Sequence, residues 1–339
     1  MSAKTHIFIT GATGYIGGTI LQCLLQHPRT DSFDITALVR DPKKIELLKS
    51  FGVSPVIGSH SDLETLENTA AQADVVITAA DCDDLPAAEA ILRGQKKTYD
   101  KTGKAPILIH TVSVLRDNAG GMFATDNVYS DLDINLIETL PHSQPHRPVD
   151  VIVSEAGRNG YVRTHIVLPS TIYGIARGPL FYSGMSNPQS IQIPALIRAG
   201  WARGQGGVIG QGKNIWPCIH IDELGDLYTV LFDSALSNPE TPNGREGYYF
   251  GESDHYLLYD VAKAVSAALA KLGRGTSEPT TFTDEEFQKF RLRNLGGNSR
   301  CRADRSRAIG WKPTKTTQDL LDSIKPEIQA LIANRRIEN

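Results

Sequence analysis

The stretch Thr10-Gly11-Ala12-Thr13-Gly14-Tyr15-Ile16-Gly17-Gly18 decides the fold of this chain. It follows the apolar run Ile7–Thr10, which predicts a buried strand, and it opens a segment with apolar residues at helical spacing. In such a turn Gly11 permits the sharp bend off the strand, Gly14 lets a pyrophosphate approach the backbone, and Gly17 brings the helix close to the sheet. Three glycines at this spacing favour a dinucleotide-binding turn over a glycine-rich connection without a ligand.

The alternation of strand and helix continues to about residue 110. Four more apolar runs predict strands, at residues 35–39, 53–57, 74–78 and 106–110, and helical patterns separate them. Strands that are apolar almost throughout, separated by helices, indicate a parallel sheet covered on both faces. The expected fold class is α/β, with a Rossmann-type doubly wound parallel sheet and a small C-terminal substrate lobe.

The regular pattern ends after about residue 117, where segments rich in glycine and proline begin. Residues 149–156 suit a strand as well as a helix, and residues 162–168 predict one more strand. We expect an NADP-binding Rossmann domain over residues 1–180, completed by about residues 215–238. Residues 181–214 and 239–339 are expected to form a smaller substrate-binding lobe and C-terminal helices.

The composition is that of an ordinary globular protein: 339 residues, 40% hydrophobic and 22% charged. Because 35 Lys and Arg face 38 Asp and Glu, we expect neither a nucleic-acid nor a membrane partner. The four cysteines lie far apart without ligand spacing, which disfavours a metal site or a disulfide framework. No apolar stretch reaches the ~20 residues of a spanning helix, and no signal peptide fits before the first strand, so we expect a cytoplasmic protein.

Further motifs accompany the glycine turn along most of the chain. They are Ala37–Asp41, Asp62-Leu63, Pro169–Gly174, His220–Leu224 and Ala308–Pro313. Together with TGATGYIGG at residues 10–18, these motifs resemble those of the short-chain dehydrogenase/reductase superfamily, in its extended and atypical branch. This branch is epimerase/dehydratase-like, and the chain also has NmrA-like features. The resemblance implies a Rossmann fold that binds a nicotinamide dinucleotide.

The resemblance also implies which residues hold the dinucleotide. They come from the glycine turn and from the ends of later strands: Gly11, Thr13, Gly14, Tyr15, Ile16, Gly17, Arg40, Lys44, Asp62, Leu63, Ala79, Ala80, Pro169 and Thr171.

Arg40 determines the predicted cofactor. NAD-specific folds usually carry an acidic residue at the end of the second strand, about 20 residues past the glycines, to bind the ribose hydroxyls. Here that place holds Arg40, whose guanidinium can pair with a 2′-phosphate and offers no acceptor to a hydroxyl. The alternative is a solvated arginine paired with Asp41. We expect NADP(H).

The catalytic position departs from the family pattern. Ser113 follows the fifth strand and, by resemblance, hydrogen-bonds a substrate oxygen. The family pairs this serine with Tyr-x-x-x-Lys, in which the lysine lowers the pKa of a tyrosine that relays a proton. No such motif occurs in this chain, and counting back from Glu155 puts Val151 and Arg147 in its two positions. Both expected groups are missing.

Three explanations stay open. Another residue can transfer the proton, and Tyr129 is the nearest phenol after Ser113, with Tyr173 and His220 as further candidates. A reactive iminium or quinone methide can accept hydride without a general acid. Alternatively, the protein can be a noncatalytic NADP(H)-sensing regulator.

The leading prediction is an NADP(H)-dependent reductase of a small organic metabolite, monomeric or homodimeric, with Ser113 and Tyr129 as catalytic residues. A nucleotide-sugar epimerase or dehydratase is the third alternative, although such enzymes depend on the missing pair.

Overall fold

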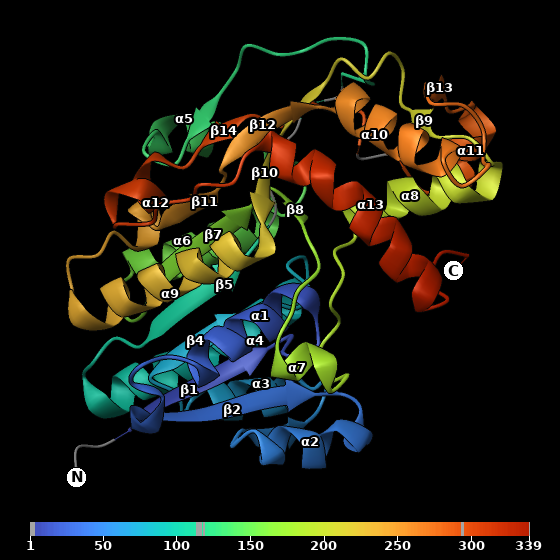
Figure 1. Cartoon of the computed structure of the whole chain (residues 1–339). Helices are drawn as coiled ribbons and strands as arrows, with labels where there is room; N and C mark the ends of the chain where they lie inside the picture. Colours follow the sequence, from blue (N-terminus) through green and yellow to red (C-terminus); the bar gives the residue numbers. More distant parts are fainter. Residues whose placement is uncertain (1–3, 113–116, 118, 293–294, 339) are drawn as a thin grey trace.

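The computed structural model describes the chain except residues 1–3, 113–116, 118, 293–294 and 339 (Figure 1). Its centre is a seven-stranded parallel sheet in the order β11-β7-β5-β4-β1-β2-β3. The strands are β1 (Thr5–Thr10), β2 (Phe33–Val39), β3 (Ser54–Ile57), β4 (Val75–Thr78), β5 (Ile107–Thr111), β7 (Arg163–Pro169) and β11 (Tyr248–Gly251). The α/β, Rossmann-type prediction is confirmed.

Helices cover both faces of this sheet. On one face α1 packs against α9, and on the other α4 packs against α3 and α6. Their bounds are α1 (Tyr15–Leu25), α3 (Leu63–Ala70), α4 (Leu85–Thr102), α6 (Arg147–Arg158) and α9 (Ile221–Ser237), and the short α2 is Ile45–Ser50. The strand order reverses between β1 and β4, so the crevice at their carboxyl ends is where such folds bind ligands.

Two predicted features of the sheet take a definite form in the structure. The ambiguous segment 149–156 is helical, within α6, because Val149 and Val153 then both face the core. Residues Tyr248–Gly251, which the sequence assigned to the second lobe, form β11 at the edge of the main sheet. All four are buried, as a strand between helix layers requires.

A second group of elements lies beyond the carboxyl ends of the strands (Figure 1). A three-stranded sheet, β8 (Thr171–Tyr173), β10 (Ile215–His220) and β12 (Asp254–Leu257), connects it to the Rossmann part. Helices α8 (Gln192–Arg203), α10 (Leu258–Ala270) and α13 (Thr317–Ala333) pack on one another. Smaller elements complete the structure, and of these α7 packs on α1 and α12 packs on β11. They are β6 (Tyr129–Ser130), α5 (Ile134–Glu138), α7 (Pro179–Tyr182), β9 (Gly207–Val208), β13 (Thr280–Thr281), α11 (Asp284–Lys289), β14 (Cys301–Arg302) and α12 (Asp304–Ala308). The exact lobe boundaries stay a prediction.

Two glycines of the turn are required by close packing. Gly11 has φ 76°, and a Cβ on it would lie 2.2 Å from the Ala79 carbonyl oxygen. A Cβ on Gly17 would lie 2.3 Å from the Gly11 carbonyl oxygen. Both approaches are far shorter than any real Cβ contact, so the bend at Gly11 and the close helix at Gly17 are confirmed.

No helix in the described part of the chain is long and apolar enough to cross a membrane.

A buried carboxyl group lies on α13. Glu327 is 0% exposed, and neither carboxylate oxygen has a hydrogen-bond partner among the described residues. Burial raises its pKa from 4.5 to about 7, and Arg198 on α8 opposes the shift. Because the folded state binds the proton more tightly, this group stabilises the fold below pH 4.5, and its contribution is lost as pH rises towards 7.

We therefore predict that Glu327→Gln is more stable relative to the wild type at pH 8 than at pH 4. The difference in unfolding free energy between variant and wild type should rise by up to about 3 kcal/mol across this range, because one pKa unit is worth about 1.4 kcal/mol. Urea unfolding at several pH values measures it. Glu338→Gln, at an exposed position of the C-terminal segment, controls for loss of charge. A pH-independent difference at Glu327 would contradict the assignment.

Candidate cofactor and active site

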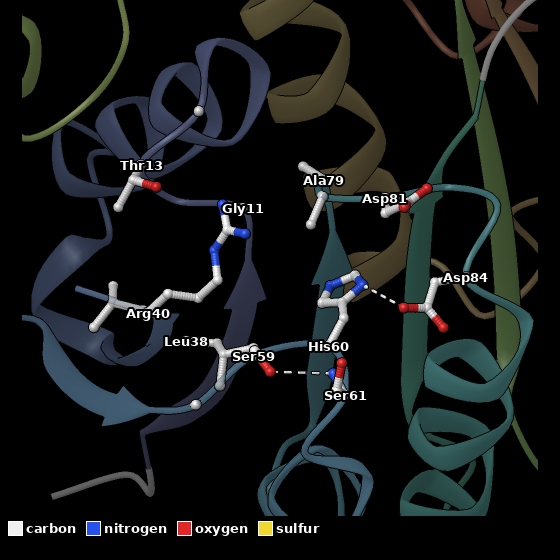
Figure 2. A pocket seen from close by; sticks show the side chains of 14 residues that line it. Gly11, Thr13, Leu38, Arg40, Ser59, His60, Ser61, Ala79, Asp81 and Asp84 are labelled. Atoms are coloured by element: carbon white, nitrogen blue, oxygen red, sulfur yellow. Dashed lines mark hydrogen bonds and ion pairs between the residues drawn. The ribbon is translucent and has the colours of Figure 1, made fainter.

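A cavity of about 380 Å³ opens at the carboxyl ends of β1, β2 and β4 (Figure 2). Six of the residues predicted to hold the cofactor line it: Gly11, Thr13, Gly14, Arg40, Ala79 and Ala80. Three consecutive residues after β3, Ser59, His60 and Ser61, also face the cavity, as do Asp81 and Asp84 after β4. The cavity therefore lies in the crevice expected from the strand order.

The start of α1 provides a place for an anion. Gly14 is the N-cap residue, and no side chain caps the helix there. The nearest atom to a Cβ built on Gly14 is the Gly11 carbonyl oxygen at 3.1 Å, so the cavity side of this residue is open. Backbone N–H groups at an uncapped helix start attract a phosphate. The cradle thus fits a dinucleotide pyrophosphate, with Gly14 leaving the space that a side chain would fill.

Arg40 extends into the same cavity. Figure 2 shows its guanidinium reaching from the end of β2 towards the glycine turn. Asp41, the neighbour considered as its partner, instead accepts a hydrogen bond from the Lys43 N–H at 3.0 Å. Within the described part of the chain Arg40 forms no ion pair. The guanidinium is therefore available to a ligand.

Two predicted cofactor residues, Lys44 and Tyr15, have other partners. The Lys44 Nζ donates to the backbone carbonyls of Gly184, at 3.3 Å, and Met185, at 2.5 Å. The Tyr15 hydroxyl donates to the Gly174 carbonyl at 2.6 Å. Both side chains thus tie the Rossmann part to the segment after β8, and neither lines the cavity.

Asp62 does not line the cavity but holds Ser59, which does. Its carboxylate accepts from the Ser59 N–H at 2.6 Å and from the Ser59 hydroxyl at 2.9 Å, and these bonds lower the pKa of Asp62. The turn that results presents Ser59 and His60 to the cavity, while Asp62 and Leu63 lie outside its lining. The sequence signal for this was the position of Gly58-Ser59-His60 directly after the third strand.

The remaining predicted cofactor residues do not line the cavity. Thr171 is buried, and its hydroxyl shares a 2.9 Å hydrogen bond with the Tyr256 hydroxyl. Pro169 ends β7, and Ile16 is half-buried in the first turn of α1. Gly17 packs against the backbone of Gly11.

Tyr129, one of the two predicted catalytic residues, does not line this cavity. Ser113 lies outside the described residues. Tyr129 lies on β6, which pairs with β14, and its N–H donates to the Arg300 carbonyl at 2.9 Å. Of the other candidates, Tyr173 is buried and donates to the Thr316 carbonyl, and His220 accepts from the Asp222 N–H at the start of α9.

Helix α6 occupies the place of the helix that carries Tyr-x-x-x-Lys. Arg147, in the tyrosine position, is buried, and its guanidinium donates to the Tyr248 hydroxyl at 3.1 Å. Val151, in the lysine position, carries no titratable group. Neither position can transfer a proton as the family pair does.

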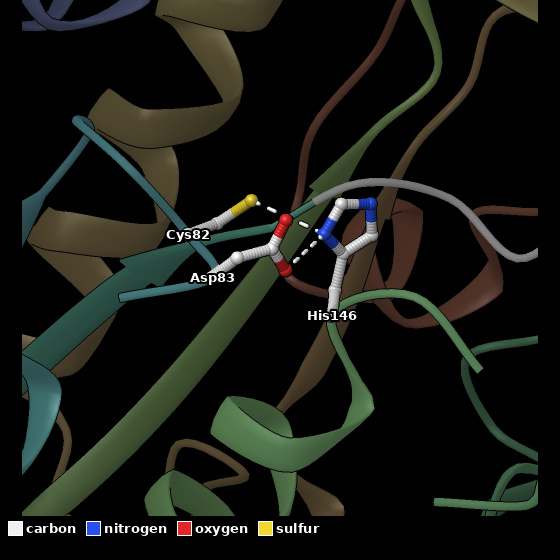
Figure 3. A group of neighbouring side chains, drawn as sticks. All are labelled: Cys82, Asp83 and His146. Atoms are coloured by element: carbon white, nitrogen blue, oxygen red, sulfur yellow. Dashed lines mark hydrogen bonds and ion pairs between the residues drawn. The ribbon is translucent and has the colours of Figure 1, made fainter. Parts of the chain in front are cut away.

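A polar cluster that the sequence does not predict joins the loop after β4 to the start of α6 (Figure 3). The His146 Nδ1 is 2.7 Å from the Asp83 Oδ1 and 3.3 Å from the Cys82 Sγ. The three donor atoms lie within 4.8 Å of one another, a spacing that a small metal site also has. The sequence gives no signal for this cluster, because more than 60 residues separate its two segments.

Comparison with known proteins agrees with this architecture. Residues 3–100 match the model of the NmrA-like family. The chain is 29% identical over 331 residues to "Oxidase ucsJ" of Acremonium sp, covering 91% of this chain and 92% of that protein. It is 32% identical over 73 residues to a farnesyl-dihydroquinoline-oxide ketoreductase of Stigmatella aurantiaca, covering 22% of this chain and 21% of the other.

Solved structures share the fold over nearly the whole chain. The PbgP3 protein of Burkholderia pseudomallei has a TM-score of 0.69 at 14% identity, covering 99% of both chains. The UDP-glucuronic acid 4-epimerase of Bacillus cereus, in complex with UDP-glucuronic acid and NAD, has a TM-score of 0.64 at 15% identity, covering 96% of this chain and all of the other. These structures confirm the Rossmann-type fold over nearly the whole chain, and the match of residues 3–100 agrees with the expected NmrA-like features.

We predict that Gly14→Val removes dinucleotide binding, because a branched side chain would fill the space open to a pyrophosphate. Its thermal midpoint should fall much less than that of Gly17→Val, whose Cβ would meet the Gly11 carbonyl oxygen at 2.3 Å. Calorimetric titration with NADPH and thermal unfolding separate the two effects. Normal NADPH binding by Gly14→Val would show that the turn is only structural.

Proposed function

We propose that this protein is an NADP(H)-dependent reductase of a small organic metabolite. The observation that carries the proposal is Arg40, which projects into a cavity already lined by the glycine turn and has no ionic partner among the described residues. A guanidinium in this position suits a 2′-phosphate, and the uncapped start of α1 suits a pyrophosphate. The acidic residue that NAD-specific folds use is absent there.

Different residues along the cavity would bind different parts of the cofactor. Gly11, Gly14 and the first N–H groups of α1 bind the pyrophosphate, and Arg40 binds the 2′-phosphate. When bound, NADPH supplies a hydride to an electrophilic carbon. The elements beyond the strand ends enclose the substrate and exclude water. Ser113 and Tyr129 stay candidates for contact with the substrate oxygen.

The redox assignment has support from the relatives, since one is named an oxidase and another a ketoreductase. A second candidate, a noncatalytic NADP(H)-sensing protein, is favoured by the match of residues 3–100 to the NmrA-like family and by the missing Tyr-x-x-x-Lys. The second lobe favours the reductase, because enclosing the cofactor serves chiefly to hold a substrate.

We predict that the protein binds NADPH more tightly than NADH and that Arg40→Ala removes most of this difference. A charge-assisted contact is worth ~1.5–3 kcal/mol, or about ten- to a hundredfold in affinity. Calorimetric titration with both cofactors measures it. Lys43→Ala is the matched control, because Lys43 is an exposed cation near Arg40 that does not line the cavity. Equal affinities in the wild type would refute the assignment.

Turnover separates the reductase from the sensor. A reductase should oxidise NADPH with at least one member of a panel of ketones, quinones and iminium compounds, and the rate should saturate with that substrate. A sensor should turn over no member of the panel, while NADP+ and NADPH differ in their effect on a partner protein. Spectrophotometry at 340 nm follows the reaction, and the absence of any turnover would favour the sensor.

A further inference from the structure

We propose that His146, oriented by Asp83, donates the proton in the reaction and thereby takes the place of the tyrosine that this chain lacks. The inference rests on the proposed function and deepens it, because it assigns the missing general acid. It is carried by the position of the pair, by its geometry and by the backbone of His146.

The position of the pair follows from the direction of the cavity. Arg40 and Ser59 place the 2′-phosphate end of a dinucleotide at β2 and β3, and the glycine turn places the pyrophosphate at β1. The other half must then run towards β4 and β5, the next strands in the sheet. Asp83 lies there, in the loop after β4, between Asp81 and Asp84, which both line the cavity.

His146 contacts this loop from the start of α6. It is the N-cap residue of α6, directly before Arg147, which stands in the position of the family's tyrosine. An acid on this residue therefore approaches the reacting centre from the same helix end as the tyrosine does in the family. The other titratable side chains on the first turn of α6 are less available, since Arg147 is bonded to Tyr248 and Asp150 is buried.

The geometry of the pair is that of an oriented acid. With the Nδ1–H donating to the Asp83 carboxylate at 2.7 Å, the ring is held in one orientation and the Nε2 is left to exchange the proton. Figure 3 shows the Nε2 pointing away from both Asp83 and Cys82. The His146 side chain is 14% exposed, so it is packed yet still reachable from the solvent side. The Nε2 hydrogen-bonds to none of the described residues.

The backbone of His146 is held in an unfavourable conformation. Its φ is 72°, in the left-handed region, where it is one of three non-glycine residues in the described part of the chain. Such a residue costs of order 1–3 kcal/mol and is found preferentially at functional sites. In this backbone conformation the imidazole lies within hydrogen-bond distance of Asp83.

Several charged or titratable groups surround the imidazole and bear on any pH measurement. Asp83 and Cys82 face it from the loop after β4, and His110 interacts with it from β5. On α6, Arg147 and Asp150 follow His146 in the chain, and Asp150 interacts with Asp83. Burial lowers the pKa of His110 to about 4 and raises that of Asp150 to about 7. The Asp150 Oδ1 has no partner among the described residues. Asp150 must therefore be varied separately.

A hydride adds to the carbonyl carbon, and the π electron pair of the C=O bond moves to the oxygen. The His146 Nε2–H bond breaks as the proton passes to that oxygen, which completes an alcohol. The carbonyl is reduced while the nicotinamide is oxidised, and the imidazole regains its proton from water. Asp83 stabilises the imidazolium that donates.

The test uses His146→Asn, because asparagine tolerates a positive φ and so preserves the backbone. We expect turnover with a carbonyl substrate from the panel to fall about a hundredfold or more, while NADPH affinity by calorimetry stays within twofold. Asp83→Asn should lower turnover less and shift the pH profile, whereas Asp150→Asn should keep the wild-type profile. His142→Gln, an exposed histidine of the same loop, is the matched control.

Two readouts separate a catalytic role from a structural one. Added imidazole should restore part of the turnover of His146→Gly, which a folding defect would not allow. In the cofactor-free protein, ¹H–¹⁵N NMR should show the His146 proton on Nδ1, and Asp83→Asn should weaken this preference for one tautomer.

The outcomes are distinguishable from failure of the proposed function. Full turnover by His146→Asn, or loss of turnover in Tyr129→Phe alone, would overturn the inference and leave the reductase intact. A wild-type protein that binds NADPH but reduces no substrate in the panel would overturn both.

Discussion

The contact between the backbones of Gly11, Gly17 and Ala79 is the constraint on which the site depends. It brings the ends of β1 and β4 and the start of α1 so close together that no side chain fits between them. A Cβ on Gly11 would lie 2.2 Å from the Ala79 carbonyl oxygen, and a Cβ on Gly17 would lie 2.3 Å from the Gly11 carbonyl oxygen. Because these three backbones meet, the helix start faces the crevice where the strand order reverses. The anion cradle is a consequence of that packing rather than of any charged side chain.

The polar groups around this cradle are unequally distributed along the cavity. Arg40 is the cation on the β2 side, whereas Asp81, Asp83 and Asp84 gather in the loop after β4. A ligand with phosphates at one end and an uncharged or cationic reacting ring at the other fits this division. The same loop lines the cavity and bonds to His146, so the proposed cofactor site and the proposed proton donor share one structural element.

Much of the fold could be predicted from local patterns. The strands of the Rossmann core are apolar on both faces, and the glycine turn and Arg40 lie at positions whose roles follow from their place in a βα unit. Contacts made by distant segments could not be predicted. Lys44 and Tyr15 carry the residue types expected at a cofactor site, yet both bind carbonyls after β8.

For the catalytic residues, too, contacts between distant segments could not be predicted. Counting along the sequence correctly placed Arg147 and Val151 on the helix before β7, and so showed that the family's acid–base pair is missing. The pairing of His146 with Asp83 depends on how α6 packs beside the loop after β4, more than 60 residues earlier. No spacing rule connects His146 with Asp83, and the sequence does not show that the backbone of His146 has a positive φ.

We propose that one cavity binds NADP(H) and presents its reactive ring to His146. The most direct measurement is a crystal structure of the protein with NADP+ and a bound substrate analogue. We expect the 2′-phosphate on Arg40, the pyrophosphate at Gly14, and the analogue's oxygen within hydrogen-bond distance of the His146 Nε2. A dinucleotide bound with its 2′-phosphate away from Arg40, or a nicotinamide whose C4 faces away from His146, would contradict it.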